Sequence, residues 1–180
     1  MIFEPFSAFN ASEYMVKFTT SAWERREAYA LRRDVFCKEQ GIFRDDDRDG
    51  IDEHAIPIVA LSMMGVAADR VVGTVRIHEE EPGLWWGSRL AVHSDFRAIG
   101  ALGTTLIKLA VSSANAFGCH TFLANVQSQN GLLFRRLRWE VLDEFEIHGK
   151  PHLRMKADLS YYPPCRTPET GFVALPKRAA

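Results

Sequence analysis

The sequence has no apolar run that approaches the length of a membrane span, and it does not begin with a basic segment followed by an apolar run. We therefore expect a soluble, unexported, cytoplasmic protein. An excess of positive charge is missing as well, because 22 lysines and arginines face 23 aspartates and glutamates. Nucleic-acid binding usually needs a strongly basic face, so this charge balance argues against a nucleic-acid partner.

Cysteine is also scarce. The three residues Cys37, Cys119 and Cys165 are an odd number at no metal-ligand spacing, which predicts reduced thiols and no metal site. The sequence contains neither an internal repeat nor a low-complexity tract. A length of 180 residues with 47% hydrophobic content suits one domain with a full core. We assign residues 1–13 to a lead-in, 14–159 to this domain and 160–180 to an extended, proline-containing arm.

Hydrophobic periodicity predicts a mixture of strands and helices. Strands are expected at 14–18, 56–63, 71–78, 84–92, 121–126, 139–147 and 153–159, and helices at 21–40, 100–117 and 129–137. The polar segment 44–54 is expected to be a loop. The three central strands form an antiparallel meander because their links are short. The strand after the long helix must cross back over the sheet, so it should run parallel to strand 84–92.

The turn between strand 84–92 and the long helix contains Arg97, Gly100 and Gly103. The helix shows one apolar stripe, formed by Ile99, Leu102, Leu106, Leu109, Ala110, Ala114 and Phe117, with Lys108, Ser112 and Asn115 opposite. A strand that runs through such a turn into a helix presents bare backbone N–H groups at the positive helix end, which can bind phosphate or pyrophosphate. Glycine-containing turns are common, so a purely structural turn is an equally good interpretation of these three residues alone.

The wider segment LAVHSDFRAIGALGTTLI resembles the acyl-CoA-binding motif of the GNAT superfamily of N-acetyltransferases, in which an R/Q-x-x-G-x-G/A loop leads into a long helix. Arg97 and Gly100 match at the expected spacing. Leu102 stands where the motif has Gly or Ala, and Gly103 follows one position later. The segment NGLLFRRLRWE is similar to the second motif of the family. The resemblance covers residues 14–159, and it extends to an uncharacterised GNAT-like group associated with nitrilase gene clusters.

The resemblance implies an α/β (α+β) GNAT fold, with a central, mixed, mostly antiparallel seven-stranded sheet flanked by helices and with strands 84–92 and 121–126 parallel and splayed. It also implies an acyl-CoA-dependent N-acyltransferase that uses acetyl-CoA or another acyl-CoA and passes the acyl group to the amine of a small metabolite by direct attack. The residues that would bind the co-substrate are Leu90, Ala91, Val92, Arg97, Ala98, Ile99, Gly100, Ala101, Leu102, Gly103, Thr104, Asn125, Asn130 and Phe134.

For two of these residues, Phe134 and Asn130, other roles remain open. Phe134 stands where the family has a tyrosine as general acid, and phenylalanine cannot donate a proton. The leaving thiolate would then take its proton from water, from Ser128 or from the incoming amine. Asn130 serves equally well as a cap of the short helix.

An amine is an ammonium ion at neutral pH, and it must lose a proton before it attacks. The candidate bases are Glu79, Glu80 and Glu81, a run at the end of strand 71–78 in which Glu79 is preferred, and Glu53 and His54, which precede strand 56–63. A glutamate run before a Pro-Gly turn is more often a solvated loop, and this alternative stays open. His148 and His152 flank a turn that borders the acceptor side in this fold.

The acidic segment 45–50 matches the first half of an EF-hand loop, but Ile56 occupies the position of the bidentate glutamate. Calcium binding is therefore not expected. The segment either attracts a cationic amine to the mouth of the acceptor site or forms a solvated connection.

Two other functions remain open. The residues Arg32, Phe36, Asp49, Asp52, Arg76 and Arg89 match the pattern of acyl-homoserine-lactone synthases, although Trp86 stands where that family has a glutamate. A non-catalytic module that binds acyl-CoA is the alternative from a different class, and Phe134 favours it. For the assembly we consider a homodimer, in which the extended arm could take part.

Overall fold

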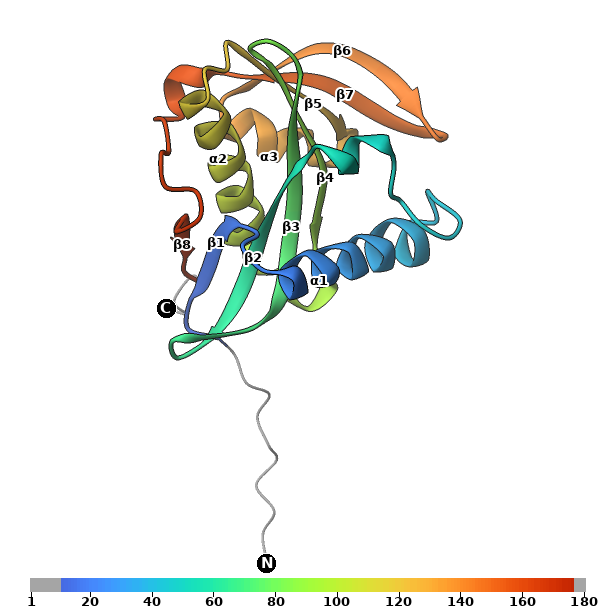
Figure 1. Ribbon diagram of the computed structural model, residues 1–180. Coiled ribbons are helices and arrows are strands. Elements are labelled where there is room, and N and C mark those ends of the chain that lie inside the picture. Colours follow the sequence, from blue (N-terminus) through green and yellow to red (C-terminus); the bar gives the residue numbers. More distant parts are fainter. Residues whose placement is uncertain (1–10, 177–180) are drawn as a thin grey trace, which may run out of the picture.

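The structure is a computed structural model that describes residues 11–176 (Figure 1). Its elements in chain order are β1 (Tyr14–Phe18), α1 (Ala22–Arg33), η1 (Asp34–Glu39), η2 (Gly50–Glu53), β2 (Ile56–Met64), β3 (Ala67–Glu81), β4 (Leu84–Val92), η3 (Ser94–Phe96), α2 (Gly100–Ala116), β5 (Thr121–Gln127), η4 (Ser128–Asn130), α3 (Gly131–Arg136), β6 (Trp139–Ile147), β7 (Lys150–Ala157), η5 (Leu159–Tyr161) and β8 (Phe172–Ala174). Within residues 11–176, no helix is long and apolar enough to cross a bilayer.

The strands form one mixed sheet in the order β6-β7-β5-β4-β3-β2-β1-β8. Strand β5 runs parallel to β4, and every other neighbouring pair is antiparallel. The predicted mixed α/β fold with a parallel pair at its centre is therefore confirmed. Strand β4 also has the predicted bounds. The sheet has eight strands instead of the expected seven, because the C-terminal segment adds one.

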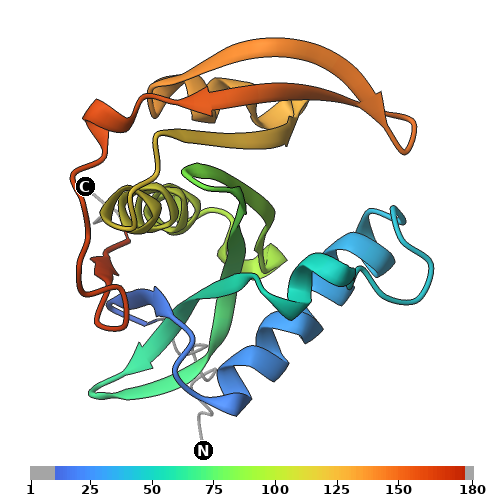
Figure 2. The ribbon, with the colours of Figure 1, turned by 45° about the horizontal axis from the view of Figure 1, so that its top comes forward.

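Helices cover both faces of the sheet (Figure 2). Helix α1 packs Ala28 and Leu31 against one face, together with apolar residues of β2. Helix α2 packs on the other face, where Leu102, Leu106 and Leu109 are fully buried. Because side chains alternate along a strand, each strand between the two helices sends every second residue to the α1 face.

The face of α2 that carries Ser112 and Asn115 was predicted to lie opposite the buried stripe, but part of this face is covered as well. The Ser112 carbonyl accepts a hydrogen bond from the Cys165 backbone N–H at 2.9 Å, and Asn115 donates its side-chain amide to the Tyr162 carbonyl at 2.7 Å. Ser112 is consequently only 3% exposed, whereas Phe117, expected on the buried stripe, is 50% exposed. The Ser112 backbone carbonyl and the Asn115 side chain therefore bind the backbone of the C-terminal arm.

That arm is more regular than its prolines indicate, so the expectation of a wholly irregular tail is wrong. Residues 172–174 form β8, which pairs antiparallel with β1 at the sheet edge, as Figure 1 shows. A hydrogen bond from the Phe18 N–H to the Pro168 carbonyl holds the arm beside the end of β1. Proline lacks only its own N–H, and none of the arm's four prolines lies within the strand, because Pro163, Pro164 and Pro168 precede it and Pro176 follows it. The expected lead-in at 1–13 lies mostly outside the described residues.

The predicted first helix has two parts. Helix α1 continues directly into a π-helical turn, Asp34–Glu39, and Gly41 follows it with a φ of +61°, as expected for a helix stop. Val35 and its neighbour Phe36 are both buried, at 3% and 7% exposed. The wider turn brings the end of this helix over the α1 face of the sheet, close to the ends of β5 and β7.

Candidate active site

The central feature of the site is a gap between β4 and β5. The parallel ladder runs from the pair Leu84 and Thr121 to the pair Gly87 and Ala124. Beyond that point, residues 88–92 and 125–127 continue as strands without pairing with each other. Backbone groups on both sides of the gap are therefore free to bind a third, extended group.

A β-bulge in β4 separates the two strands. Arg76 of β3 pairs with Ser88, and Thr74 pairs with Ala91, so Arg89 and Leu90 together face one residue of β3. Arg89 adopts a φ of +56°, a left-handed conformation that costs a residue with a side chain about 1–2 kcal/mol. The hydrogen bonds of its guanidinium group offset this strain.

A cavity of about 420 Å³ passes through the gap. On the α1 face its lining includes Phe36, Gln40, Phe43, Asp49, Arg76, His78, Glu80, Trp86, Ser88, Arg89, His148 and His152, and on the α2 face it includes Ile107, Val111, Phe122, Phe134 and Trp139. Leu90, Asn125 and Asn130 also line it. The cavity joins the two faces of the sheet, so a group bound on one face can reach a group bound on the other.

The head of α2 is open. Ile99 precedes the helix and provides no side-chain cap, and a Cβ atom added at Gly100 or Gly103 would meet no heavy atom within 4 Å. Leu102 is fully buried, which explains why this position does not follow the Gly or Ala of the motif. The Leu102 N–H donates to the Ile99 carbonyl at 3.0 Å, and the predicted anion site at the head of this helix stays a prediction.

Arg97 is already engaged at this helix head. Its guanidinium donates to the Val92 carbonyl at 3.0 Å and forms an ion pair with Glu39 at 2.6 Å. The side chains of Arg97 and Glu39 are both partly exposed, at 47% and 38%. An incoming phosphate would therefore compete with one solvent-exposed carboxylate for Arg97.

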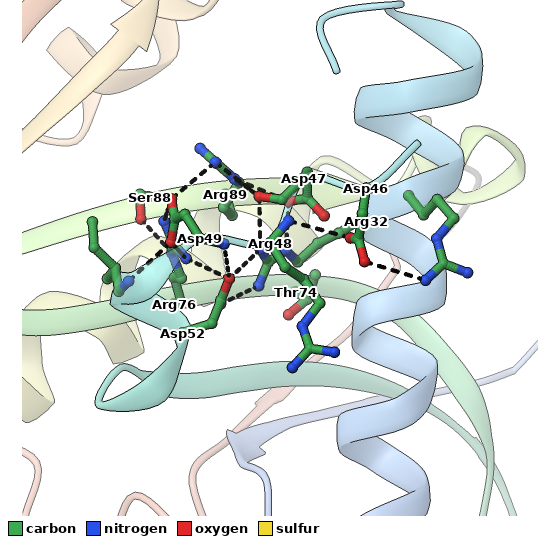
Figure 3. Close-up of polar contacts among 12 residues, drawn as sticks. Arg32, Asp46, Asp47, Arg48, Asp49, Asp52, Thr74, Arg76, Ser88 and Arg89 are labelled. Carbon is green, nitrogen blue, oxygen red and sulfur yellow. Dashed lines mark hydrogen bonds and ion pairs between the residues drawn. The ribbon is translucent and has the colours of Figure 1, made fainter. Parts of the chain in front are cut away.

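On the α1 face, a network of three arginines and three aspartates surrounds the bulge (Figure 3). Arg32 binds Asp47 at 2.7 Å and Asp52 at 2.6 Å. Arg76 binds Asp49 at 2.6 Å and Asp52 at 2.8 Å. Arg89 completes the network by binding Asp47 at 2.9 Å and Asp49 at 3.1 Å. Every arginine therefore binds two aspartates, and the six charges cancel.

The network also shifts the acidity of its aspartates. Burial alone would raise the pKa of Asp52, but hydrogen bonds from Arg32 and Arg76 outweigh burial and hold that pKa well below its usual range. The hydrogen bond from Arg76 similarly lowers the pKa of Asp49. Both carboxylates remain ionised at neutral pH.

These contacts show that the acidic segment is more than a solvated connection. Asp47 is 1% exposed, whereas Asp45, Asp46 and Asp49 are exposed. The aspartates at 47, 49 and 52 are paired with arginines, which reduces the negative charge that they offer to a cationic substrate. The sequence signal was the match of Arg32, Arg76 and Arg89 to one family pattern, because these residues do lie together.

The predicted bases Glu79, Glu53 and His54 lie outside the lining of the cavity. Glu79 accepts a hydrogen bond from the Gly83 backbone N–H at 2.7 Å and so closes the β3–β4 turn. Glu53 is exposed on η2. His54 packs edge-on against His78, with 5.7 Å between the ring centroids. None of the three is brought to the gap between β4 and β5.

Glu80, one of the three glutamates that the sequence suggested as bases, does line the cavity, and so does His78, which the sequence did not suggest. They alternate with Ile77 and Glu79 along β3, so they share the α1 face with Arg76. Counting every second residue from Arg76 would have identified both.

The remaining predicted binding residues surround the gap. Leu90, Asn125, Asn130 and Phe134 line the cavity, Ala91 is buried against the α1 side, and residues 97–104 form the turn and first residues of α2. Phe134 is 6% exposed and packs edge-on against Trp139. Asn130 precedes α3 but makes no side-chain cap there, so capping does not account for it.

The family model described as "Acetyltransferase (GNAT) family" matches residues 15–132, and the chain belongs to this family of N-acetyltransferases. The family assignment confirms the predicted enzyme class. Among curated proteins, the chain is 27% identical over 135 residues to the uncharacterized N-acetyltransferase YjcF of Bacillus subtilis strain 168, covering 74% of this chain and 91% of that protein.

Solved structures show the same fold. A putative N-acetyltransferase from Lactobacillus plantarum has a TM-score of 0.72 at 23% identity, with 83% of this chain and 99% of that chain covered. Escherichia coli ElaA has a TM-score of 0.67 at 18% identity, with coverages of 81% and 98%. BjaI, a CoA-dependent acyl-homoserine lactone synthase solved with SAM and isopentyl-CoA, has a TM-score of 0.63 at 20% identity, with coverages of 81% and 83%.

Proposed function

We propose that this acetyltransferase passes an acyl group, acetyl in the first instance, from CoA to the amine of a small metabolite by direct attack. The observation that carries the proposal is the cavity through the β4–β5 gap. On the α2 side of the sheet its lining includes Ile107 and Val111, about two to three turns along the helix from its head, and on the other side it reaches a chamber lined by His78, Glu80 and Trp86. A thioester held in this gap would be reachable from the chamber.

On the co-substrate side, residues 97–104 would hold the pyrophosphate of acyl-CoA and residues 90–92 its pantetheine arm. The His93 N–H donates to the Val72 carbonyl of β3, so the alternation of the backbone turns the N–H groups of Leu90 and Val92 toward the gap. An extended pantetheine could pair with these groups as a further strand would. One of the two N–H groups would then stabilise the oxyanion that forms at the thioester carbon.

On the acceptor side, contacts that cross the gap favour a small molecule over a folded protein. Gln127 of β5 donates a hydrogen bond to Gln40 at 2.9 Å, and Lys150 donates to the Gln40 carbonyl. Phe43 packs edge-on against His148. These contacts join the end of the first helix to the β6–β7 hairpin across the gap, which limits the size of an acceptor.

The proposal is tested by replacing Gly100 with Glu, which places a carboxylate beside the phosphates. Because an added Cβ meets nothing within 4 Å, the apo protein should melt within a few degrees of wild type. The thermal stabilisation that CoA gives the wild-type protein should disappear. Gly100→Gln is the control of nearly equal size without charge, and it should retain most of the stabilisation. An unchanged shift in Gly100→Glu removes the helix head from the CoA site.

A second candidate is acyl transfer to S-adenosylmethionine, as in acyl-homoserine-lactone synthases. The clustering of Arg32, Arg76 and Arg89 with the three aspartates favours it, together with the fold shared with BjaI. Trp86 stands where that family has a glutamate, which disfavours it. Thiol release from acetyl-CoA or acyl carrier protein with S-adenosylmethionine, but not with simple amines, would select this candidate. Tight CoA binding without thiol release for any acceptor would select a binding module.

A further inference from the structure

The α1 face of β3 places one imidazole at the end of the gap. His78 pairs with Trp86 in the sheet, and Ile77 pairs with Gly87, the last residue of β4 that also pairs with β5. His78 therefore lies one residue before the point where β4 and β5 part. It is 7% exposed and lines the cavity.

This imidazole is unusual because its polar atoms are not used by the fold. Its Nδ1 is buried and has no hydrogen-bond partner within residues 11–176. A buried polar atom without a partner costs free energy. The neighbouring Arg76 has no unpaired donor of this kind, since Asp49, Asp52 and Ser88 bind its guanidinium. Of these two neighbours on β3, His78 is therefore the one with a polar atom left for a ligand.

The charges around His78 keep it neutral. Arg76 and Glu80 face it from β3, His54 from the segment before β2, and Asp49 from the acidic segment. Burial and then the positive charges of Arg76 and His54 lower the pKa of His78, and Glu80 and Asp49 oppose this only in part. A histidine with a lowered pKa is unprotonated at neutral pH, so its ring nitrogen has a lone pair that can accept a proton.

We propose that His78 accepts the proton of the acceptor ammonium, and thereby generates the free amine that attacks the thioester. The inference rests on the proposed function. One N–H proton of the ammonium passes to the imidazole. The freed lone pair forms the C–N bond, and the C–S bond breaks with its electron pair on sulfur. The second amine proton passes to sulfur, giving the amide and the CoA thiol, and the imidazolium returns its proton to water through Glu80.

Glu80 extends this arrangement to the surface. It lines the same cavity two residues along β3 and accepts a hydrogen bond from the Trp86 indole at 2.7 Å. Because no arginine of the network binds it, Glu80 is the carboxylate of the chamber that can attract an ammonium and later receive the proton from His78. Glu80 is a positioning and relay residue in this scheme, whereas His78 touches the reacting nitrogen.

The test compares two acceptors that differ in their need for a base. With acetyl-CoA, the first probe is the best acceptor from a panel of primary alkylamines and arylalkylamines, which are ammonium ions at neutral pH. The second is hydroxylamine, which is largely unprotonated there, with its uncatalysed reaction subtracted. His78→Gln should lower kcat/KM for the alkylamine about 100-fold or more and leave the rate with hydroxylamine within about threefold. His120→Gln, at an exposed histidine outside the cavity lining, is the matched control and should retain both rates within a few-fold.

The outcomes separate the two proposals. Equal losses with both acceptors, or no loss with either, would overturn the role of His78 while leaving acyl transfer intact. A wild-type protein that binds CoA but releases no thiol with any probe would overturn the transfer function itself. If His78→Gln does not fold, His78→Ala opens space at the same site. Added imidazole should then restore the rate with the alkylamine and have no effect with hydroxylamine, and absence of this rescue refutes the inference.

Discussion

The two sides of the β4–β5 gap offer different chemical groups to a ligand. On the α1 side, side chains are fixed by ion pairs, and nearly every charged group of the network has two partners. On the other side, the head of α2 offers backbone groups, two glycines and no capping side chain. A common co-substrate can be bound by backbone that any sequence supplies, whereas a particular acceptor needs particular side chains held in place. Arg89 belongs to both sides, because its backbone forms the bulge and its guanidinium joins the network.

The largest loss of stability is expected when the ion network on the α1 side loses one aspartate. Replacing Asp52 with Ala leaves Arg32 and Arg76, both about 3% exposed, each short of one partner. We expect a loss of about 3–5 kcal/mol in the free energy of unfolding, because an uncompensated buried charge is costly. Urea unfolding measures the loss. Asp34→Ala removes an exposed pair with Lys38 and should cost less than about 0.5 kcal/mol. Equal effects of the two changes would mean that the network adds nothing to stability.

Low pH should reduce the stability that the ion network on the α1 side contributes. The folded-state pKa of Asp52 is lowered, so its stabilising contribution is complete above the ordinary Asp pKa of about 4 and is lost as the pH falls below it. Between pH 4 and 3 the free energy of unfolding should fall with a slope that approaches about 1.4 kcal/mol per pH unit for this one group. Urea titrations from pH 6 to 3 measure the slope. Asp52→Ala should show a shallower dependence, and parallel curves would contradict the assignment.

The backbone and side-chain contributions of Arg89 can be separated with a matched pair of variants. Arg89→Ala and Arg89→Gly both remove the ion pairs, but only glycine accepts the positive φ without strain. We therefore expect the alanine variant to be less stable than the glycine variant by about 1 kcal/mol. Thermal unfolding of the two proteins side by side gives the difference. A glycine variant that is no more stable than the alanine variant would indicate that the bulge relaxes once the guanidinium is gone.

The smallest effect on stability is expected at the helix head. Glu39→Gln removes the exposed partner of Arg97 and should change the free energy of unfolding by less than about 1 kcal/mol. It should also tighten CoA binding a few-fold, since Arg97 no longer has to leave a carboxylate to meet a phosphate. Calorimetric titration with CoA measures the affinity, and Asp34→Gln serves as the control for a general change in charge. Weaker CoA binding would mean that Glu39 positions Arg97 instead of competing for it.

The sequence predicted what depends on local pattern. Strand β4 and the apolar stripe of α2 were found because their periodicity is clear over many residues. The eighth strand was missed because it has three residues and follows three prolines, so its pairing with β1 depends on partners about 155 residues away in the chain.

The ion network was missed for a related reason. Arg32 and Asp52 are 20 residues apart, and Asp47 and Arg89 are 42 apart. A run of aspartates has the composition of a solvated loop until its partners are known. His78 was overlooked because it stands next to three glutamates in an ordinary strand pattern, and only the register with Trp86 places it beside the gap.

The C-terminal arm has a consequence for how the protein is made. A ribosome delivers the chain from its N-terminus, so α2 leaves it well before residues 162–174. Until those residues arrive, the Ser112 carbonyl lacks the Cys165 N–H, the Asn115 amide lacks the Tyr162 carbonyl, and the edge of β1 is unpaired. The helix that is proposed to hold CoA should therefore gain its final rigidity only when the arm docks. Protection of the α2 amides from hydrogen exchange should rise at that step.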